Sequence, residues 1–215
     1  MTYLELVNKV LTRLREDTVT TVGETAYSSL VGEFVNDAKE FVENAWNWSA
    51  LRSTVVVPTV ASDYTYSLTG TGDLSEVKTV TNDTSNFFME QKPQAWLEQQ
   101  LYINGAVEGS PRYYVFSGID GSGDLQVSVY PIPNDVYSLR FKVALKNGEL
   151  SSDNDTLTIP TKPVIHLATA LAARERGETG GTSSAELLAI ADRSLSDAIS
   201  MDANKYPEEL IYRVV

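Results

Sequence analysis

The spacing of apolar residues changes twice along the chain, from a helical period to an alternating one and back again. In residues 2–15 apolar positions recur every three or four residues, which predicts an amphipathic helix. Residues 26–51 carry a longer pattern of the same kind, which predicts a second helix. Its expected buried stripe consists of Leu30, Phe34, Ala38, Phe41, Ala45 and Trp48. Trp46 lies off this stripe, so either the helix end is covered on two sides or Trp46 faces a neighbouring chain at a subunit interface.

The middle of the chain has the alternation and β-branched content of strands. Strands are expected at residues 54–57, 64–68, 74–81, 112–116, 125–130, 137–145 and 156–159. Pro93 suits the first turn of a short helix over residues 93–101. Because the strands are closely spaced and separated by turns rich in Gly and Pro, they predict an antiparallel sandwich or barrel rather than a parallel sheet.

Helical spacing returns in residues 162–176, and a fourth helix is expected from Thr182 or Ser183 to about Met201. Each pair of helices alone would leave its apolar stripe exposed. The predicted fold is therefore α+β, a discontinuous four-helix bundle with an inserted antiparallel β-sandwich or barrel domain. The expected division is a helical bundle domain at 1–52 and 161–203, a β domain at 53–160 and a C-terminal docking tail at 204–215. With Phe41 in the bundle core, Phe41→Ala is expected to cost about 3 to 5 kcal/mol.

The C-terminal tail is rich in apolar and strand-forming residues, whereas termini usually become polar. The residues expected to dock are Tyr206, Leu210, Ile211, Tyr212, Val214 and Val215. They would either pack on their own subunit or dock on a partner, by strand addition or as an apolar hook. Pro207 stops the preceding helix and favours an extended backbone at Tyr206 in both cases.

The amino-acid composition excludes several kinds of covalent cross-link and functional site. The 215 residues include no cysteine and one histidine, His166, which excludes disulfides, thiol catalysis, thiolate metal sites and zinc sites with two imidazoles. No apolar run approaches the roughly 18 residues that a membrane helix needs. The N-terminus has no basic region before an apolar block, so we expect synthesis in the cytoplasm and no membrane association.

The chain is acidic, with 17 basic residues, 29 acidic residues and a net charge of −12. A protein that binds DNA by sequence would need more Lys and Arg to neutralise phosphates. The acidity has two interpretations, solubility or a channel wall that repels DNA and lets it slide past. The charge alone does not choose between them.

No catalytic, cofactor or metal site is expected. His166 lies near the start of a helix and no Gly-x-Ser-x-Gly elbow is present, which favours a packing histidine. The acidic segments 120–124 and 147–155 lack the residue order of a calcium loop and are interpreted as solvated turns. The carboxylate pairs Glu208 with Glu209 and Glu24 with Glu33 carry no spacing that indicates a glycosidase. An enzyme is therefore not expected.

Tyrosine is frequent in the β region, at Tyr64, Tyr66, Tyr113, Tyr114, Tyr130 and Tyr137. Tyrosine is a good strand former and most of these residues fit ordinary sheet faces. The same residues would also suit flat platforms for sugar rings. A carbohydrate-binding β-sandwich module, of a phage tail or a cell-surface protein, is thus the alternative function.

Three segments together resemble a known family. Residues 109–116 are Gly-Ser-Pro-Arg-Tyr-Tyr-Val-Phe, residues 125–133 are Leu-Gln-Val-Ser-Val-Tyr-Pro-Ile-Pro, and residues 157–160 are Leu-Thr-Ile-Pro before a helix. This order, with the aromatic-rich segment 44–48, is similar to the head-to-tail adaptor (connector) proteins of tailed bacteriophages.

The resemblance implies a structural protein of the virion neck, located between capsid and tail. It implies a homo-oligomeric ring, of twelve subunits in related phages, that joins the portal protein to a tail or nozzle protein and continues the DNA channel. Genomic DNA would pass through without sequence-specific binding, and the C-terminal tail would extend to the portal. No cofactor is implied.

Overall fold

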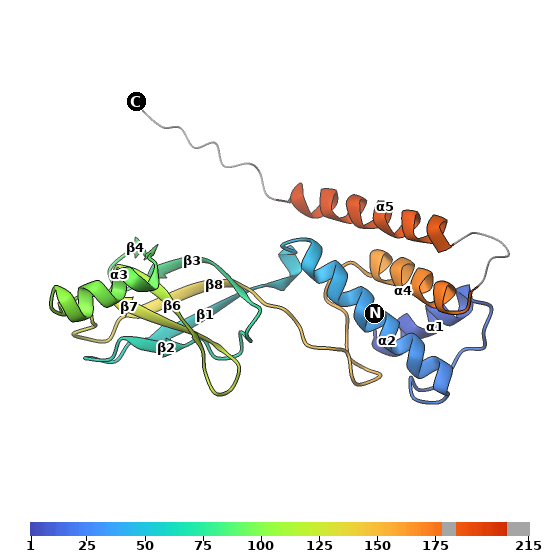
Figure 1. Ribbon diagram of the computed structural model, residues 1–215, viewed down its shortest axis with the longest axis horizontal. Helices are drawn as coiled ribbons and strands as arrows, with labels where there is room; N and C mark the ends of the chain where they lie inside the picture. Colours follow the sequence, from blue (N-terminus) through green and yellow to red (C-terminus); the bar gives the residue numbers. More distant parts are fainter. Residues whose placement is uncertain (178–183, 206–215) are drawn as a thin grey trace, which may run out of the picture. The chain divides into compact units, whose positions relative to one another are not determined.

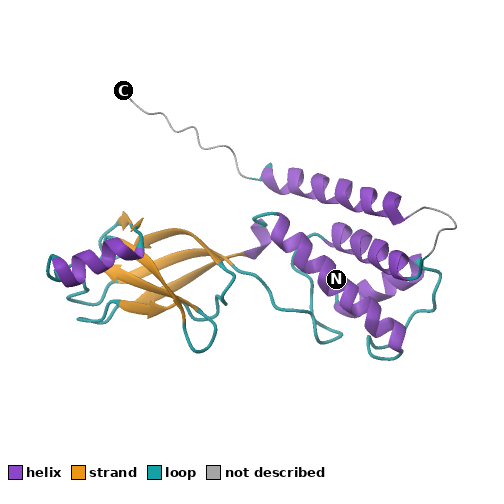
Figure 2. Ribbon diagram, in the orientation of Figure 1, coloured by secondary structure: helices purple, strands orange, loops and turns teal. Residues whose placement is uncertain are grey.

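The computed structural model describes residues 1–177 and 184–205, and it divides the chain into two compact units. The helical unit contains residues 1–50 and the chain from residue 148 onward, and the β unit contains residues 51–147. Figures 1 and 2 show the long helices in the first unit and the strands, together with a short helix, in the second. The described residues form five α-helices and two sheets. The predicted α+β class is thereby confirmed.

The helical unit contains α1 (Tyr3–Arg13), α2 (Ala26–Ala45), α4 (Thr161–Glu175) and α5 (Ser184–Ala203). Two capping boxes fix where α1 and α2 begin. The hydroxyl of Thr2 accepts from the backbone of Glu5, whose carboxylate accepts from the backbone of Thr2. Thr25 and Ser28 form the same reciprocal pair at the start of α2.

The face that α2 buries matches the predicted stripe only in part: Ala38 is buried and Phe34 half-buried, as expected, but Ala45 is exposed. The buried apolar residues of α2 are Val31, Val35, Ala38 and Val42. Leu30 is 36% exposed and Phe41 is 53% exposed, so the expectation that Phe41 is a core residue is wrong. The physical reason is side-chain packing: the Tyr3 ring of α1 lies over Gly32, where a Cβ would collide with its hydroxyl, so α1 covers this smaller-residue face.

The second helix also ends earlier than predicted. Trp46 already has an extended backbone, with φ −153° and ψ 155°. Trp48 is buried although it lies beyond the helix, because its indole Nε1 donates to the carbonyl of Val42 at 2.7 Å. A short 3-10 helix, η1 (Ser49–Leu51), then leads to the first strand.

The last helix packs along α4, and the two run side by side in Figure 1. Ala191 of the predicted stripe is buried, and Leu187 and Leu195 are half-buried. Other apolar residues of α5 face solvent, with Ile190 44% and Met201 73% exposed. Helix α5 therefore buries one narrow face.

Residues 148–160 belong to the helical unit, although the sequence interpretation placed them in the β domain. Leu150 exchanges two hydrogen bonds with the Asn36 side chain on α2, at 3.0 and 3.1 Å. The backbone of Tyr3 donates to Asp155 at 2.8 Å, and Leu157 donates to Met1 at 2.9 Å. The strand expected at 156–159 is reduced to one bridge between Thr156 and Thr2.

The β unit contains two four-stranded sheets. The first has the order β1 (Arg52–Pro58), β8 (Ser138–Ala144), β3 (Glu76–Asn82), β4 (Phe87–Phe88). The second has the order β2 (Thr65–Ser67), β7 (Leu125–Tyr130), β6 (Tyr113–Ile119), β5 (Glu90–Gln91). Only the β5–β6 pair among these strands is parallel. Both sheets contribute to one core, which includes Leu68, Val127, Leu139 and Phe141.

The short helix predicted at residues 93–101 is present, and the structure shows that it lies against β6. It comprises α3 (Gln94–Glu98) and a π-helical continuation, η2 (Gln99–Ile103). Leu97 is buried, and the Trp96 ring meets Tyr113 and Tyr130 edge-on at centroid distances of 4.9 and 5.5 Å.

Candidate protein-binding interfaces

The Gly-x-Pro-x-Tyr-Tyr and Pro-x-Pro segments lie side by side in the β unit. The backbone of Gly109 donates to Ile132 at 2.8 Å, and that of Arg112 donates to Tyr130 at 2.9 Å. The amide of Asn82 donates to the carbonyl of Pro111 at 3.2 Å. These bonds satisfy backbone groups at a turn where proline supplies no N–H. The motif therefore builds the frame of the β unit.

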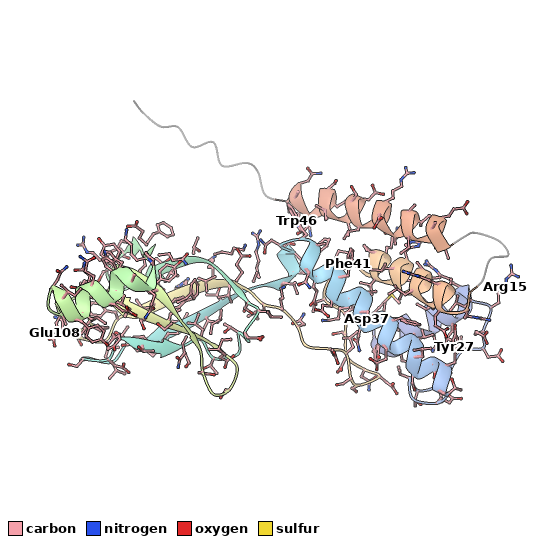
Figure 3. The ribbon with its side chains drawn as sticks, viewed as in Figure 1. Arg15, Tyr27, Asp37, Phe41, Trp46 and Glu108 are labelled. Atoms are coloured by element: carbon pink, nitrogen blue, oxygen red, sulfur yellow. The ribbon has the colours of Figure 1, made fainter. Side chains whose placement is uncertain are left out.

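That frame supports an exposed apolar loop, residues 102–108, which begins with the last two residues of η2 and which sequence reasoning did not identify. Tyr102 is 75% exposed, Ile103 78% and Val107 54%. The loop is held at both ends, since Asn104 donates to Gln99 and Ile132 donates to Val107, each at 2.9 Å. Figure 3 labels Glu108 at its end. A fixed loop with exposed apolar side chains is typical of a protein-binding surface. The available signal was Tyr102-Ile103 directly before an Asn-Gly turn.

Trp46, the predicted interface residue, lies beside the C-terminal end of α5. It is 38% exposed, and its indole Nε1 donates to the Asp202 carboxylate at 3.3 Å. The backbone and hydroxyl of Ser49 donate to the same carboxylate at 2.9 and 2.6 Å. Lys205 forms an ion pair with it at 2.9 Å. Trp46, labelled in Figure 3, thus has a partner in its own chain and is still partly exposed to solvent.

The Asp202 carboxylate is held in its charged form. Burial alone would raise its pKa, but hydrogen bonds from Lys205 and Ser49 outweigh burial and lower the pKa to about 2. The cluster fixes the position from which residues 206–215 continue. The predicted docking residues Tyr206, Leu210, Ile211, Tyr212, Val214 and Val215 lie outside the described residues.

An open groove of about 610 Å³ runs between α4 and α5. Its lining includes Pro163, His166, Ile190, Arg193, Asp197 and Met201. The guanidinium of Arg13 lies 3.1 Å from Nδ1 of His166, and burial, Arg13 and Lys162 all lower the pKa of the imidazole. Nδ1 of His166 accepts from arginine, and among the described residues no carboxylate hydrogen-bonds the ring to orient it as a catalytic base.

The acidic turns hold backbone groups. Asp155 accepts from the amides of Ser151 and Ser152 at 2.8 and 2.7 Å, and these bonds lower the pKa of its carboxyl group. Asp120 accepts from the amides of Ser122 and Asp124 at 2.8 and 2.9 Å. Across residues 1–177 and 184–205, no three His, Asp or Glu side chains are arranged to hold a metal ion. The helices within these ranges include none that could cross a membrane.

Four of the six tyrosines of the β region present no open ring face to a sugar. Tyr66, Tyr114 and Tyr130 are buried at 8%, 6% and 7% exposure. Tyr113 is covered by the Trp96 edge and by the Lys92 ammonium, which lies 5.2 Å from its ring centroid. Stacking on a sugar requires an open ring face, so this arrangement disfavours the carbohydrate-binding alternative.

The chain was compared with curated proteins and with protein-family models. No curated protein matches the chain. The family model described as SU10 adaptor protein matches residues 1–209, which span both structural units. The predicted resemblance to bacteriophage adaptor proteins is therefore confirmed, and the chain belongs to the SU10 adaptor protein family.

Proposed function

We propose that this adaptor protein is the subunit of a ring that joins the portal to the tail of a phage and continues the DNA channel. The observation that carries the proposal is the family match over residues 1–209, which includes every described element of both units. In this proposal the helical unit acts as a four-helix bundle and the β unit as an inserted sandwich. The ring has about twelve copies, as the family resemblance implies, and its role is structural rather than enzymatic.

The charge distribution supports a channel role for the helical unit. Residues of this unit include 10 basic and 19 acidic side chains, a net charge of −9, whereas the β unit has 7 and 10, a net charge of −3. A ring of such subunits would have a strongly negative helical zone. DNA would be repelled from that wall and would not be retained by it.

Electron microscopy of the purified protein mixed with its portal tests the ring directly. Class averages should show one added ring on the portal, with a rotational symmetry that gives the copy number. Portal particles without an added ring at saturating adaptor concentration would contradict the proposal.

DNA retention tests the meaning of the charge. Purified rings should not retain duplex DNA at moderate salt, because they offer few cations to displace phosphate counterions. Tight retention that weakens with salt would show that basic side chains line the passage instead.

A further inference from the structure

The longest sheet edge in the described part of the chain is the outer edge of β1. Strand β1 ends the order β1-β8-β3-β4 and is paired with β8 alone. The backbone of Thr59 donates to Tyr137, and that of Leu145 donates to Leu51. The backbone N–H and C=O groups of the odd-numbered residues of β1 therefore point towards β8. In an antiparallel ladder the alternate residues point the other way. Thr54 and Val56 therefore direct their N–H and C=O groups away from β8.

This edge is unusually open for a protein sheet. Its register with β8 runs without a shift from Arg52 to Pro58, whereas the β3–β8 register contains an irregularity. Arg52 and Pro58 stand at the two ends of the strand, the residues between them carry no charge, and Val56 is 52% exposed. The other edge strands, β2, β4 and β5, have only two or three residues. Sheets usually protect long edges with bulges, lysines or covering elements, so this edge is suited to receive another strand.

The C-terminal tail has the length and pattern of the missing strand. Residues 210–215 would span about 20 Å as a strand, close to the about 23 Å of β1. Alternation would place Leu210, Tyr212 and Val214 on one face. That face would extend the apolar side of the sheet beside Val55 and Val57, which pack on the core.

The charged residues of the tail and of the sheet are compatible with this strand addition. The opposite face of the tail would carry the two charged residues, Glu209 and Arg213, together with Ile211 and Val215. On the outer face of the sheet, Lys142 lies opposite Thr54 and Arg140 lies opposite Val56. Arg140 is paired with Asp83 at 2.7 Å, whereas Lys142 has no ion pair among the described residues. Lys142 would lie one strand beyond Thr54 from the added tail, so its long side chain could reach across Thr54 towards Glu209.

We propose that the C-terminal tail of one subunit adds as a strand to the β1 edge of a neighbouring copy. This proposal rests on the ring function proposed above, because a closed ring needs two different complementary patches on every subunit. The tail and the β1 edge are such a pair, one donor and one acceptor on each chain. It extends the docking predicted from the sequence by naming the acceptor.

Cross-linking distinguishes a neighbour from the same chain, and the absence of native cysteine makes it specific. A Val56→Cys protein and a differently tagged Arg213→Cys protein are mixed and treated with a short bismaleimide. Cross-linked heterodimers are expected. Ile119→Cys is the matched control, because Ile119 lies on β6 with the same 52% exposure. Equal cross-linking to the Ile119→Cys protein, or cross-links found only within a chain that carries both Val56→Cys and Arg213→Cys, would overturn the proposal.

Sedimentation then tests the strand itself. A chain that ends at Lys205 and the Val56→Pro variant should associate at least tenfold more weakly than the full chain, while Val56→Thr associates normally. Circular dichroism checks that each variant is folded. If Val56→Pro does not fold, Lys142→Glu provides the measurement: it should weaken association, and Glu209→Lys should restore it. Undiminished association of the truncated chain would overturn the proposal.

Portal binding is measured separately on the full and truncated chains. If the full chain self-associates through the tail but no form binds the portal, the adaptor function fails and the strand addition stands. If the tail is needed for portal binding and not for self-association, the adaptor function stands and the strand addition to a neighbouring copy fails. The tail then docks on the portal.

Discussion

The Asp202 cluster allows a quantitative prediction about how α5 is held. Asp202→Ala removes the acceptor for the Ser49 backbone, the Ser49 hydroxyl and the Trp46 indole, and it breaks the ion pair with Lys205. Lowering the carboxyl pKa from 3.8 to about 2 corresponds to about 2 kcal/mol in favour of the charged form. Because Asp202 is only 5% exposed, we expect the substitution to destabilise the docked end of α5 by about 2 kcal/mol.

Hydrogen exchange measures this opening without requiring the two units to unfold together. A cost of about 2 kcal/mol should speed exchange of the α5 amides roughly 30-fold. Asp197→Ala is the matched control, because Asp197 is an exposed acid on the same helix. Acceleration below about threefold in Asp202→Ala, or an equal effect in the control, would refute the assigned role.

The same carboxylate predicts how pH affects α5. Folding lowers the pKa of Asp202 from 3.8 to about 2. The contribution of its carboxylate to the stability of docked α5 is therefore complete above about pH 4 and is lost as the pH falls through about 2. Corrected for intrinsic exchange rates, the α5 protection of the natural chain should approach that of Asp202→Asn between pH 4 and pH 2. A difference that persists unchanged at about pH 2 would show that the charge of Asp202 is not responsible.

Three further substitutions are tested by urea denaturation. Phe41→Ala should lower the free energy of unfolding by less than about 1 kcal/mol, whereas Val35→Ala should lower it by about 2 kcal/mol. Of these two residues only Val35 is fully buried. A larger loss for Phe41→Ala than for Val35→Ala would show that Phe41 belongs to the core, as the sequence pattern predicted. Trp48→Phe should cost about 1 to 3 kcal/mol by leaving the Val42 carbonyl without its donor, and a neutral result would mean that water replaces the indole. Replacing Tyr102 and Ile103 by serine should change stability by less than about 0.5 kcal/mol, since both are exposed; a larger loss would show that the loop packs on its own unit.

Helix positions were predictable where the signals are local. The structure begins α1 after Thr2 and α2 after Thr25, and each of these threonines accepts from the backbone three residues later. Pro160 precedes α4, as the sequence indicated. Caps and prolines act within one turn of the chain, so they can be recognised without knowing the fold.

Pairings between distant residues were not predictable in the same way. The parallel β5–β6 pair joins Glu90 to Tyr113, and two-residue strands have no measurable period. Segment 148–160 looked like the end of the β domain because it contains Leu157-Thr158-Ile159. Its backbone partners are Met1 and Tyr3, which lie at the other end of the chain.

The misassigned face of α2 and the unrecognised 102–108 loop have one physical cause. Large apolar side chains produce the same sequence pattern whether their own fold or another molecule covers them. On α2, Phe41 gave the larger hydrophobic signal, but Val35 lies where α1 can approach closely beside Gly32. At η2, Ile103 stays 78% exposed although its backbone segment is held in place. A subunit that must bury apolar surface once in folding and again in assembly carries both sets of residues, and only packing geometry separates them.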